Sequence, residues 1–228
     1  FELELYEGRA IVSLVAFTMQ RWRPRRGGKL SQCLTWPMSV NSFLNVRTYV
    51  RHQGEPGAYF MTQWLSHPFC LLARAPTLRL PWHLGRMDYE HRYEAKYVRG
   101  SVYDGRTRRL EYAAAIEADT IFSPSPSGSL AEFCLERYTA FALCGGREVI
   151  FRIWHPSWPQ CPIAPTIVDH GLLAKSGKWP SCARLLGGHY STGCAEVWMG
   201  RVRRLQQTPT SEIPFHAARP THANQNET

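Results

Sequence analysis

The chain has 228 residues and a formal net charge of +9, and 44% of its residues are hydrophobic. This length suffices for one domain with a substantial core. No apolar run reaches the roughly eighteen residues that a membrane-spanning helix needs, and no signal peptide is recognisable. We therefore expect a soluble protein without a membrane partner.

The seven cysteines are scattered, and no two of them are spaced as Cys-x-x-Cys. This usage favours reduced thiols over a disulfide framework and offers no zinc-binding pattern. We expect a cytoplasmic protein with no metal ion, and nothing in the sequence indicates a cofactor.

Arginine accounts for 23 of the 27 basic residues. Because arginine binds carboxylates and phosphates bidentately, this excess is compatible with an anionic ligand or a nucleic acid. Codon usage alone can produce the same bias. The most basic stretch, Arg21–Lys29, contains Pro24 and two glycines and is typical of a solvated loop between strands.

The first half of the chain predicts β-hairpins. Phe1–Thr18 contains alternating and apolar stretches around a Glu7-Gly8 turn, and its start in mid-strand suggests that an N-terminal segment is missing. A strand from Asn45 alternates sharply and is followed by a turn at 53–57 and a return strand over Ala58–Trp64. Arg47 and Tyr49 share one face of this hairpin, and they could line a cavity.

A corner is expected at Leu78–Met87, where Pro81 precedes Trp82 and His83. There an amphipathic ring and a near-neutral base are predicted to lie side by side on a turn. A strand pair, Asp88–Lys96 and Arg108–Asp119, is expected around a turn near Asp104.

The clearest helix is predicted over Leu130–Tyr138, because Ser129 and Glu132 have the spacing of a capping box. Further strands are expected at Glu148–His155, Ile167–Leu173, Gly187–Tyr190 and Cys194–Leu205. Residues 206–228 are polar and are predicted to form a disordered tail. This order indicates one mainly β domain over 1–205, an antiparallel barrel or cone with one or two helices.

Five motifs resemble those of a known family: Glu7-Gly8-Arg9-Ala10 with Val12–Phe17, Asn45-Val46-Arg47-Thr48-Tyr49-Val50, Leu80-Pro81-Trp82-His83-Leu84, Gly128-Ser129-Leu130 with Glu136-Arg137-Tyr138, and His155-Pro156-Ser157-Trp158-Pro159. Together they resemble the uncharacterised YqjF-like family of the acetoacetate-decarboxylase-like superfamily. The resemblance covers roughly Phe1 to Leu205. It implies a cone-shaped antiparallel β-barrel around a small cavity.

In the decarboxylases of this superfamily, a lysine at the matching corner forms a Schiff base. Trp82 and His83 occupy this corner here, and neither can form an imine. Of the four lysines, Lys96 is the one predicted on a strand that could face the cavity. The family commonly has a Glu just before its Asn-Val-Arg motif, whereas Phe43 and Leu44 precede Asn45 here.

The candidate ligand-binding residues are Arg47, Tyr49, Trp82, Arg86, Glu136 and Tyr138, and the candidate catalytic residue is His83. Each also has a structural interpretation. Arg47 could clamp a carboxylate or form an ion pair with Glu136. His83 could be a general base or a histidine packed beneath Trp82, and His155 is expected to be structural.

Three functions are consistent with these residues. The first is binding of a small organic anion in a barrel cavity without a Schiff-base lysine, whether or not a reaction follows. The second is a lyase or isomerase acting on a keto acid, with His83 as general acid or base. The third is nucleic-acid binding through Arg21–Lys29 and Arg201–Arg204, which ranks last because the cations are spread along the chain. A homo-oligomer is compatible with all three.

Overall fold

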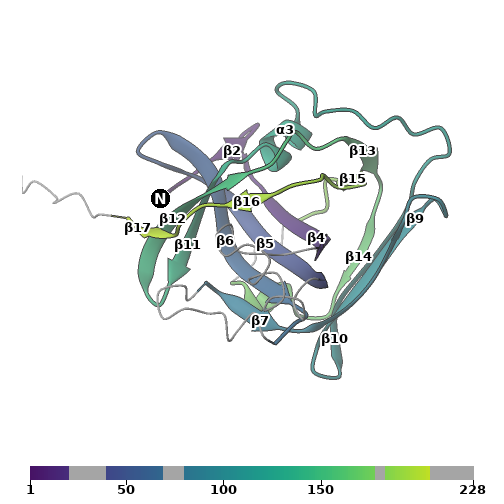
Figure 1. Cartoon of the computed structure of the whole chain (residues 1–228), viewed down its shortest axis with the longest axis horizontal. Coiled ribbons are helices and arrows are strands. Elements are labelled where there is room, and N and C mark those ends of the chain that lie inside the picture. Colours follow the sequence, from purple (N-terminus) through teal and green to yellow (C-terminus); the bar gives the residue numbers. More distant parts are fainter. Residues whose placement is uncertain (21–39, 69–79, 178–182, 206–228) are drawn as a thin grey trace, which may run out of the picture.

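The computed structural model describes residues 1–20, 40–68, 80–177 and 183–205. The regular secondary structure of these residues is almost entirely β-strand (Figure 1). The bounds of the strands are as follows: β1 Glu2–Leu3, β2 Leu5–Tyr6, β3 Arg9–Ala10, β4 Val12–Gln20, β5 Val40–His52, β6 Glu55–Leu65, β7 Trp82–Leu84, β8 Arg86–Arg92, β9 Tyr97–Asp104, β10 Thr107–Ala115, β11 Thr139–Cys144, β12 Arg147–Trp154, β13 Gln160–Ile163, β14 Thr166–Asp169, β15 Gly188–Ser191, β16 Trp198–Met199 and β17 Arg203–Arg204. The helices within these described residues are the α-helix α3 (Leu130–Leu135) and the 3-10 helix η2 (Leu173–Lys175).

The predicted hairpin of β5 and β6 is confirmed, and it is the longest in the described chain. Its turn has two residues, Gln53 and Gly54, both with the positive φ of a hairpin turn. A β-bulge at Met61 breaks the register, so that Arg47 pairs with Phe60 whereas Asn45 pairs with Gln63. The bulge decides which side chains of β6 share a face with Arg47.

The turn of the first predicted hairpin is confirmed, because β2 and β3 pair around Glu7 and Gly8, but this hairpin has only two residues in each strand. β4 then runs antiparallel to β5. On the other side of β5, β6 pairs in parallel with both β11 and β7, at different positions along its length. These strands, with β1, β12, β16 and β17, form a nine-stranded sheet.

A separate four-stranded sheet has the order β14-β10-β9-β8. The prediction of one strand pair here was wrong, since Tyr97–Asp104 forms a third strand and Lys96 lies in the preceding turn with φ of 57°. The turn after Asp104 is confirmed at Gly105. Strand β11 was not predicted, whereas β12 begins one residue before the predicted strand and ends one residue earlier.

Helix α3 is shorter than predicted and ends at Leu135. The capping serine is confirmed, because Ser129 Oγ accepts a hydrogen bond from the Glu132 amide. The Glu132 carboxylate accepts from the Gly128 amide, one residue before the position of a standard capping box. None of the helices in the described ranges has the length and apolar character to cross a bilayer.

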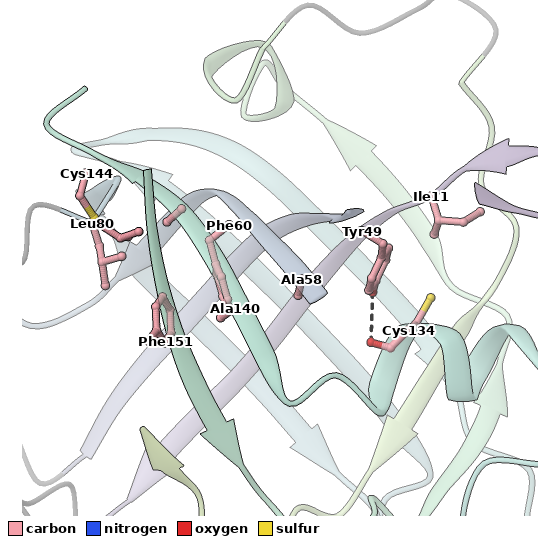
Figure 2. Packing of buried hydrophobic residues seen from close by; sticks show 11 residues of the cluster. Ile11, Tyr49, Ala58, Phe60, Leu80, Cys134, Ala140, Cys144 and Phe151 are labelled. Atoms are coloured by element: carbon pink, nitrogen blue, oxygen red, sulfur yellow. Dashed lines mark hydrogen bonds between the residues drawn. The ribbon is translucent and has the colours of Figure 1, made fainter. Parts of the chain in front are cut away.

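Two clusters of buried side chains lie on opposite faces of the nine-stranded sheet. One packs α3 against β5, β6, β11 and β12 around Tyr49, Phe60 and Phe151 (Figure 2). The other joins the nine-stranded to the four-stranded sheet around Leu44, Trp64 and other apolar residues. We call these faces the helix face and the inter-sheet face.

The expectation of a mainly β protein with few helices is confirmed. In the described ranges no sheet closes on itself, and the strands are divided among four sheets of nine, four, two and two strands. The basic stretch 21–29 and the predicted tail 206–228 lie outside the described residues.

Candidate functional site

Arg47 and Tyr49 lie together on the helix face, as predicted from the alternation of β5. Both donate to the Cys134 carbonyl near the end of α3, Arg47 Nη2 at 2.6 Å and Tyr49 Oη at 3.1 Å. Figure 2 shows Tyr49 pointing toward this end of the helix. Ser13 forms a further hydrogen bond with Tyr49 Oη at 2.6 Å, and burial raises the pKa of this phenol. Tyr49 is therefore a core residue that positions the helix.

The half-buried guanidinium of Arg47 has no carboxylate partner in the described ranges. Its Nε is buried and lacks a hydrogen-bond acceptor there. The alternative of an ion pair with Glu136 is not found, since Glu136 accepts from Tyr138, Ser157 and Trp158 instead. The segments 21–39, 69–79 and 178–182 contain no Asp or Glu. No residue in these three segments can therefore neutralise Arg47.

A row of polar side chains crosses the helix face next to Arg47. Trp82 Nε1 donates to Gln63 Oε1 at 2.7 Å, and Gln63 Nε2 donates to Asn45 Oδ1 at 3.1 Å. Trp82 pairs with Gln63 across β7 and β6, and Gln63 pairs with Asn45 across β6 and β5. Asn45 and Arg47 are two positions apart on β5, so their side chains project from the same face.

Apolar rings border this row on the side away from Arg47. Phe43 lies two positions before Asn45, and its ring stacks on Phe17 of β4 with a centroid distance of 5.1 Å. Phe43 and Trp82 both pack against Leu65. The helix face therefore carries an apolar row, an amide row and a cation on neighbouring positions of β5.

His83 lies on the opposite, inter-sheet face, and the prediction that it lies beside Trp82 on a turn was wrong. The two residues belong to strand β7, where successive side chains alternate. The His83 ring stacks on Trp64 with a centroid distance of 5.0 Å. Burial and the neighbouring Lys175 lower its pKa, and Asp104 opposes this shift.

Glu136 and Tyr138 form a separate cluster after α3. Glu136 accepts from the Tyr138 hydroxyl at 2.5 Å and from Ser157 Oγ at 2.9 Å. The Tyr138 ring stacks on His155, whose Nδ1 is 2.9 Å from the Pro156 carbonyl. The bond to Glu136 raises the pKa of Tyr138 to about 12. The contact of His155 with the Pro156 backbone agrees with its expected structural role.

Arg86 lies on the outer face of the four-stranded sheet, far along the chain from Arg47 and on another sheet. It pairs with Asp88 at 3.3 Å, and its guanidinium carbon is 4.0 Å from the centroid of the Tyr103 ring. A groove of about 470 Å³ on this face is lined by Asp88, Tyr103, Glu111 and neighbours. Its carboxylates are paired with arginines, as Glu111 is with Arg108 at 2.7 Å.

The lysines of the described ranges are held by aromatic rings and a carboxylate. Lys96 Nζ is 4.0 Å from the centroid of Tyr93, and Lys175 pairs with Asp104. Neither is on the helix face near Arg47. No group of three or more His, Cys, Asp or Glu in the described part of the chain could hold a metal ion.

Gln63 and Asn45 were not among the residues predicted from sequence to form a site. The residue of β6 opposite Asn45 follows from the register of the predicted hairpin only if the bulge at Met61 is known. The seven candidate residues thus lie at four separate locations. Arg47, Tyr49 and Trp82 are together on the helix face.

A family model described as an uncharacterized conserved protein, DUF2071, matches residues 1–194. The chain belongs to this family. A curated relative, the uncharacterized protein YqjF of Bacillus subtilis (strain 168), is 26% identical over 158 residues, which are 69% of this chain and 62% of the relative. The aligned part of the chain thus spans less than two thirds of the length of YqjF, a member of the same YqjF-like family.

Two solved structures of the enduracididine biosynthesis enzyme MppR share the fold. The structure with HEPES buffer bound has a TM-score of 0.54 at 13% identity, and the match covers 85% of this chain and 74% of the MppR chain. The complex with pyruvate has a TM-score of 0.52 at 13% identity, with coverage of 84% and 71%. At this level of identity the two structures show a shared fold.

Proposed function

We propose that this YqjF-like protein binds a small organic anion on the helix face, with Arg47 as the anion-binding residue. The observation that carries the proposal is the half-buried guanidinium of Arg47, whose Nε is buried without an acceptor and which has no carboxylate partner in the described ranges. Partial burial of a cation without a counter-charge carries a desolvation cost, and an anionic ligand supplies the missing charge. In this proposal the helix face lines the cavity of a cone-shaped barrel.

The role of Arg47 is compatible with its bond to Cys134. That bond uses one Nη2 hydrogen, and the guanidinium has five N–H donors in a planar fork. The bond fixes the plane of the fork, so the remaining donors are held in place before a ligand arrives. Preorganised donors of this kind bind carboxylates with little loss of side-chain entropy.

The fold relatives provide a second support. MppR, which has the same fold, was solved in complex with pyruvate, a small carboxylate. Pyruvate and other small carboxylates are therefore the first ligands to test. The proposal includes no Schiff base, because Trp82 occupies the corner at which the decarboxylases have their lysine.

His83 is not part of the proposed site, because it lies on the inter-sheet face. No described contact favours the alternative of a lyase or isomerase that acts on a keto acid with His83 as general acid or base. The nucleic-acid alternative depends on Arg21–Lys29, which lies outside the described ranges, and on Arg201–Arg204, where β17 pairs with β12. Anion binding is therefore the function that we put forward.

The proposal is tested by titrating purified protein with pyruvate, acetate and octanoate in a calorimeter. Arg47→Lys keeps the charge but removes the fork, and we expect at least about a tenfold loss of affinity, since a hydrogen bond to a charged group contributes about 1.5–3 kcal/mol. Arg99→Gln is the matched control, because Arg99 forms an exposed pair with Glu90 on the outer face. Equal affinities of Arg47→Lys and wild type for every carboxylate would overturn the proposal.

A further inference from the structure

We propose that the ligand is a monocarboxylate with an apolar tail, and that Trp82 sets the polarity of its binding site through Gln63 and Asn45. This inference rests on the proposed function and names its ligand class. The head of the ligand binds Arg47 and Asn45, and the tail lies over Phe43 and its neighbours.

The orientation of both amides follows from the indole of Trp82. An indole N–H can only donate, so the atom of Gln63 that faces it at 2.7 Å must be the oxygen. The Gln63 nitrogen then faces Asn45 at 3.1 Å and must meet an oxygen. Asn45 Oδ1 is therefore used within the row, and Nδ2 remains as the free end of this amide.

Asn45 Nδ2 has no acceptor among the described residues, and neither has Arg47 Nε, which is buried. The two donors come from alternate positions of β5, about 6.6 Å apart at the backbone, and project from one face. A carboxylate offers two oxygens that can accept from both. Because the free ends of this pair are all donors, the site selects an acceptor group and not an ammonium or amide nitrogen.

The class of tail follows from what flanks the donors. The rings of Phe43 and Phe17 are half-buried and stacked, and Trp82 packs with Phe43 against Leu65. A short hydrophilic acid leaves this surface uncovered, whereas an alkyl or aryl chain extends across it. Each buried methylene should then strengthen binding about fourfold.

The test uses the full chain and a series of straight-chain carboxylates from acetate to decanoate, with octanamide and octylamine as uncharged and cationic analogues. We expect affinity to rise with chain length, and octanamide and octylamine to bind at least about tenfold more weakly than octanoate. Affinities that do not change from acetate to decanoate would overturn the apolar tail.

We call the control of the Asn45 orientation by Trp82 through Gln63 the relay. It is tested with Gln63→Glu and Trp82→Phe. A carboxylate at position 63 accepts from both Trp82 and Asn45, so Asn45 turns its oxygen toward the ligand and octanoate affinity falls about ten- to hundredfold. Trp82→Phe frees both amides to turn and should give a smaller loss. The Arg99→Gln variant should bind octanoate like wild type.

The possible failures are distinguishable. If no carboxylate binds wild type, the proposed function is wrong and the inference falls with it. If octanoate binds and depends on Arg47 but is indifferent to Gln63→Glu, anion binding stands and the relay is wrong. Because Trp82 packs in the core, a cooperative thermal transition is required of each variant, and Asn45→Asp provides an independent readout. Octanoate must bind Asn45→Asp more weakly, and octylamine more tightly, than wild type; the reverse order would overturn the relay.

Discussion

Trp82 and His83 are neighbours in the chain, yet their rings lie on opposite faces of the nine-stranded sheet. Trp82 hydrogen-bonds to Gln63 on the helix face, and His83 stacks on Trp64 on the inter-sheet face. The parallel pairing of β7 with β6 enforces this separation, since each residue pairs with one of two successive residues of β6. A single catalytic centre that uses both rings is therefore incompatible with the fold.

The environment of His83 predicts a depressed pKa that depends on Lys175. Burial and Lys175 both lower the pKa of His83 below its usual 6.5, and Asp104 opposes them. Lys175→Met removes one lowering charge, so the pKa of His83 should rise. The pKa is measured by following the imidazole signals in an NMR pH titration. Lys96→Met, which removes a lysine that lies over Tyr93, is the control and should leave the titration of His83 unchanged.

The same shift makes stability depend on pH. The folded state disfavours the protonated imidazole, so it binds fewer protons than the unfolded state between the folded pKa and 6.5. Stability from His83 is present above pH 6.5 and is lost as pH falls toward the folded pKa. His83→Gln should remove this part of the pH dependence in urea unfolding. An unchanged slope below pH 6.5 would contradict the assignment.

The sequence was sufficient for the hairpin of β5 and β6 but not for the row of polar side chains beside Arg47, and the bulge at Met61 explains why. If the register set by the Gln53-Gly54 turn continued without a bulge, Asn45 would pair with Thr62. Trp64 would then lie on the helix face in place of Gln63. The extra residue Met61 turns the side chains of the following part of β6 to the opposite faces. A bulge has no clear pattern in a single sequence, so the Trp82–Gln63–Asn45 row could not be foreseen.

The faces of β5, by contrast, were predictable because its alternation is unbroken. Arg47 and Tyr49 were placed on one face from sequence, and the structure brings them to the same carbonyl. The end of α3 was overestimated because Tyr138 continues an apolar spacing. Glu136 leaves helical geometry with ψ of 65°, and the chain then enters β11. Pairing of β11 with β6 outweighs the local preference for helix.

A buried ion pair near α3 should be more important for stability than its exposed neighbour. Glu4 pairs with Arg137 at 2.8 Å, and the two side chains are only 10% and 9% exposed. Glu4→Gln leaves the buried guanidinium of Arg137 without its carboxylate and should lower the free energy of unfolding by about 3 kcal/mol. The measurement is urea unfolding followed by circular dichroism.

Arg51 provides the matched control, because it pairs with the same carboxylate at 2.7 Å but is 47% exposed. Arg51→Gln should cost less than about 1 kcal/mol. Equal losses in Glu4→Gln and Arg51→Gln would show that burial of the Arg137 pair has no special energetic role.

Gly100 should tolerate no side chain, because the ring of Tyr112 lies over it. A Cβ at this position would be 2.4 Å from both Cζ and Oη of Tyr112. Gly100→Ala should therefore lower the free energy of unfolding by about 2 kcal/mol through overpacking. The Tyr112 hydroxyl is also 2.7 Å from His91 Nε2, so the ring cannot move away without loss of this bond.

A double-mutant cycle separates this clash from the intrinsic effect of alanine in a strand. In a Tyr112→Leu background the ring is absent, and Gly100→Ala should be neutral or slightly stabilising there. Additive effects of the two substitutions would show that the Tyr112 ring is not the group that restricts Gly100.

Tyr138 should titrate at unusually high pH because of one hydrogen bond. Its hydroxyl donates to Glu136 at 2.5 Å, and this bond raises the pKa of Tyr138 to about 12. Ionising the phenol would place two negative charges together, so the folded state favours the protonated form. Glu136→Gln removes the negative charge, and the pKa should fall toward the usual 10. The ionisation is followed by NMR of tyrosine labelled at Cζ.

The sign of the linked stability follows from the raised pKa. The contribution of Tyr138 is fully present below pH 10, and it is lost as pH rises from 10 toward 12, since the unfolded state releases the proton first. Glu132→Gln is the control, because the Glu132 carboxylate binds the Gly128 amide and not Tyr138. Tyr138 should titrate near 12 in wild type and in this control. A Tyr138 that still titrates near 12 in Glu136→Gln would mean that burial, not the carboxylate, raises its pKa.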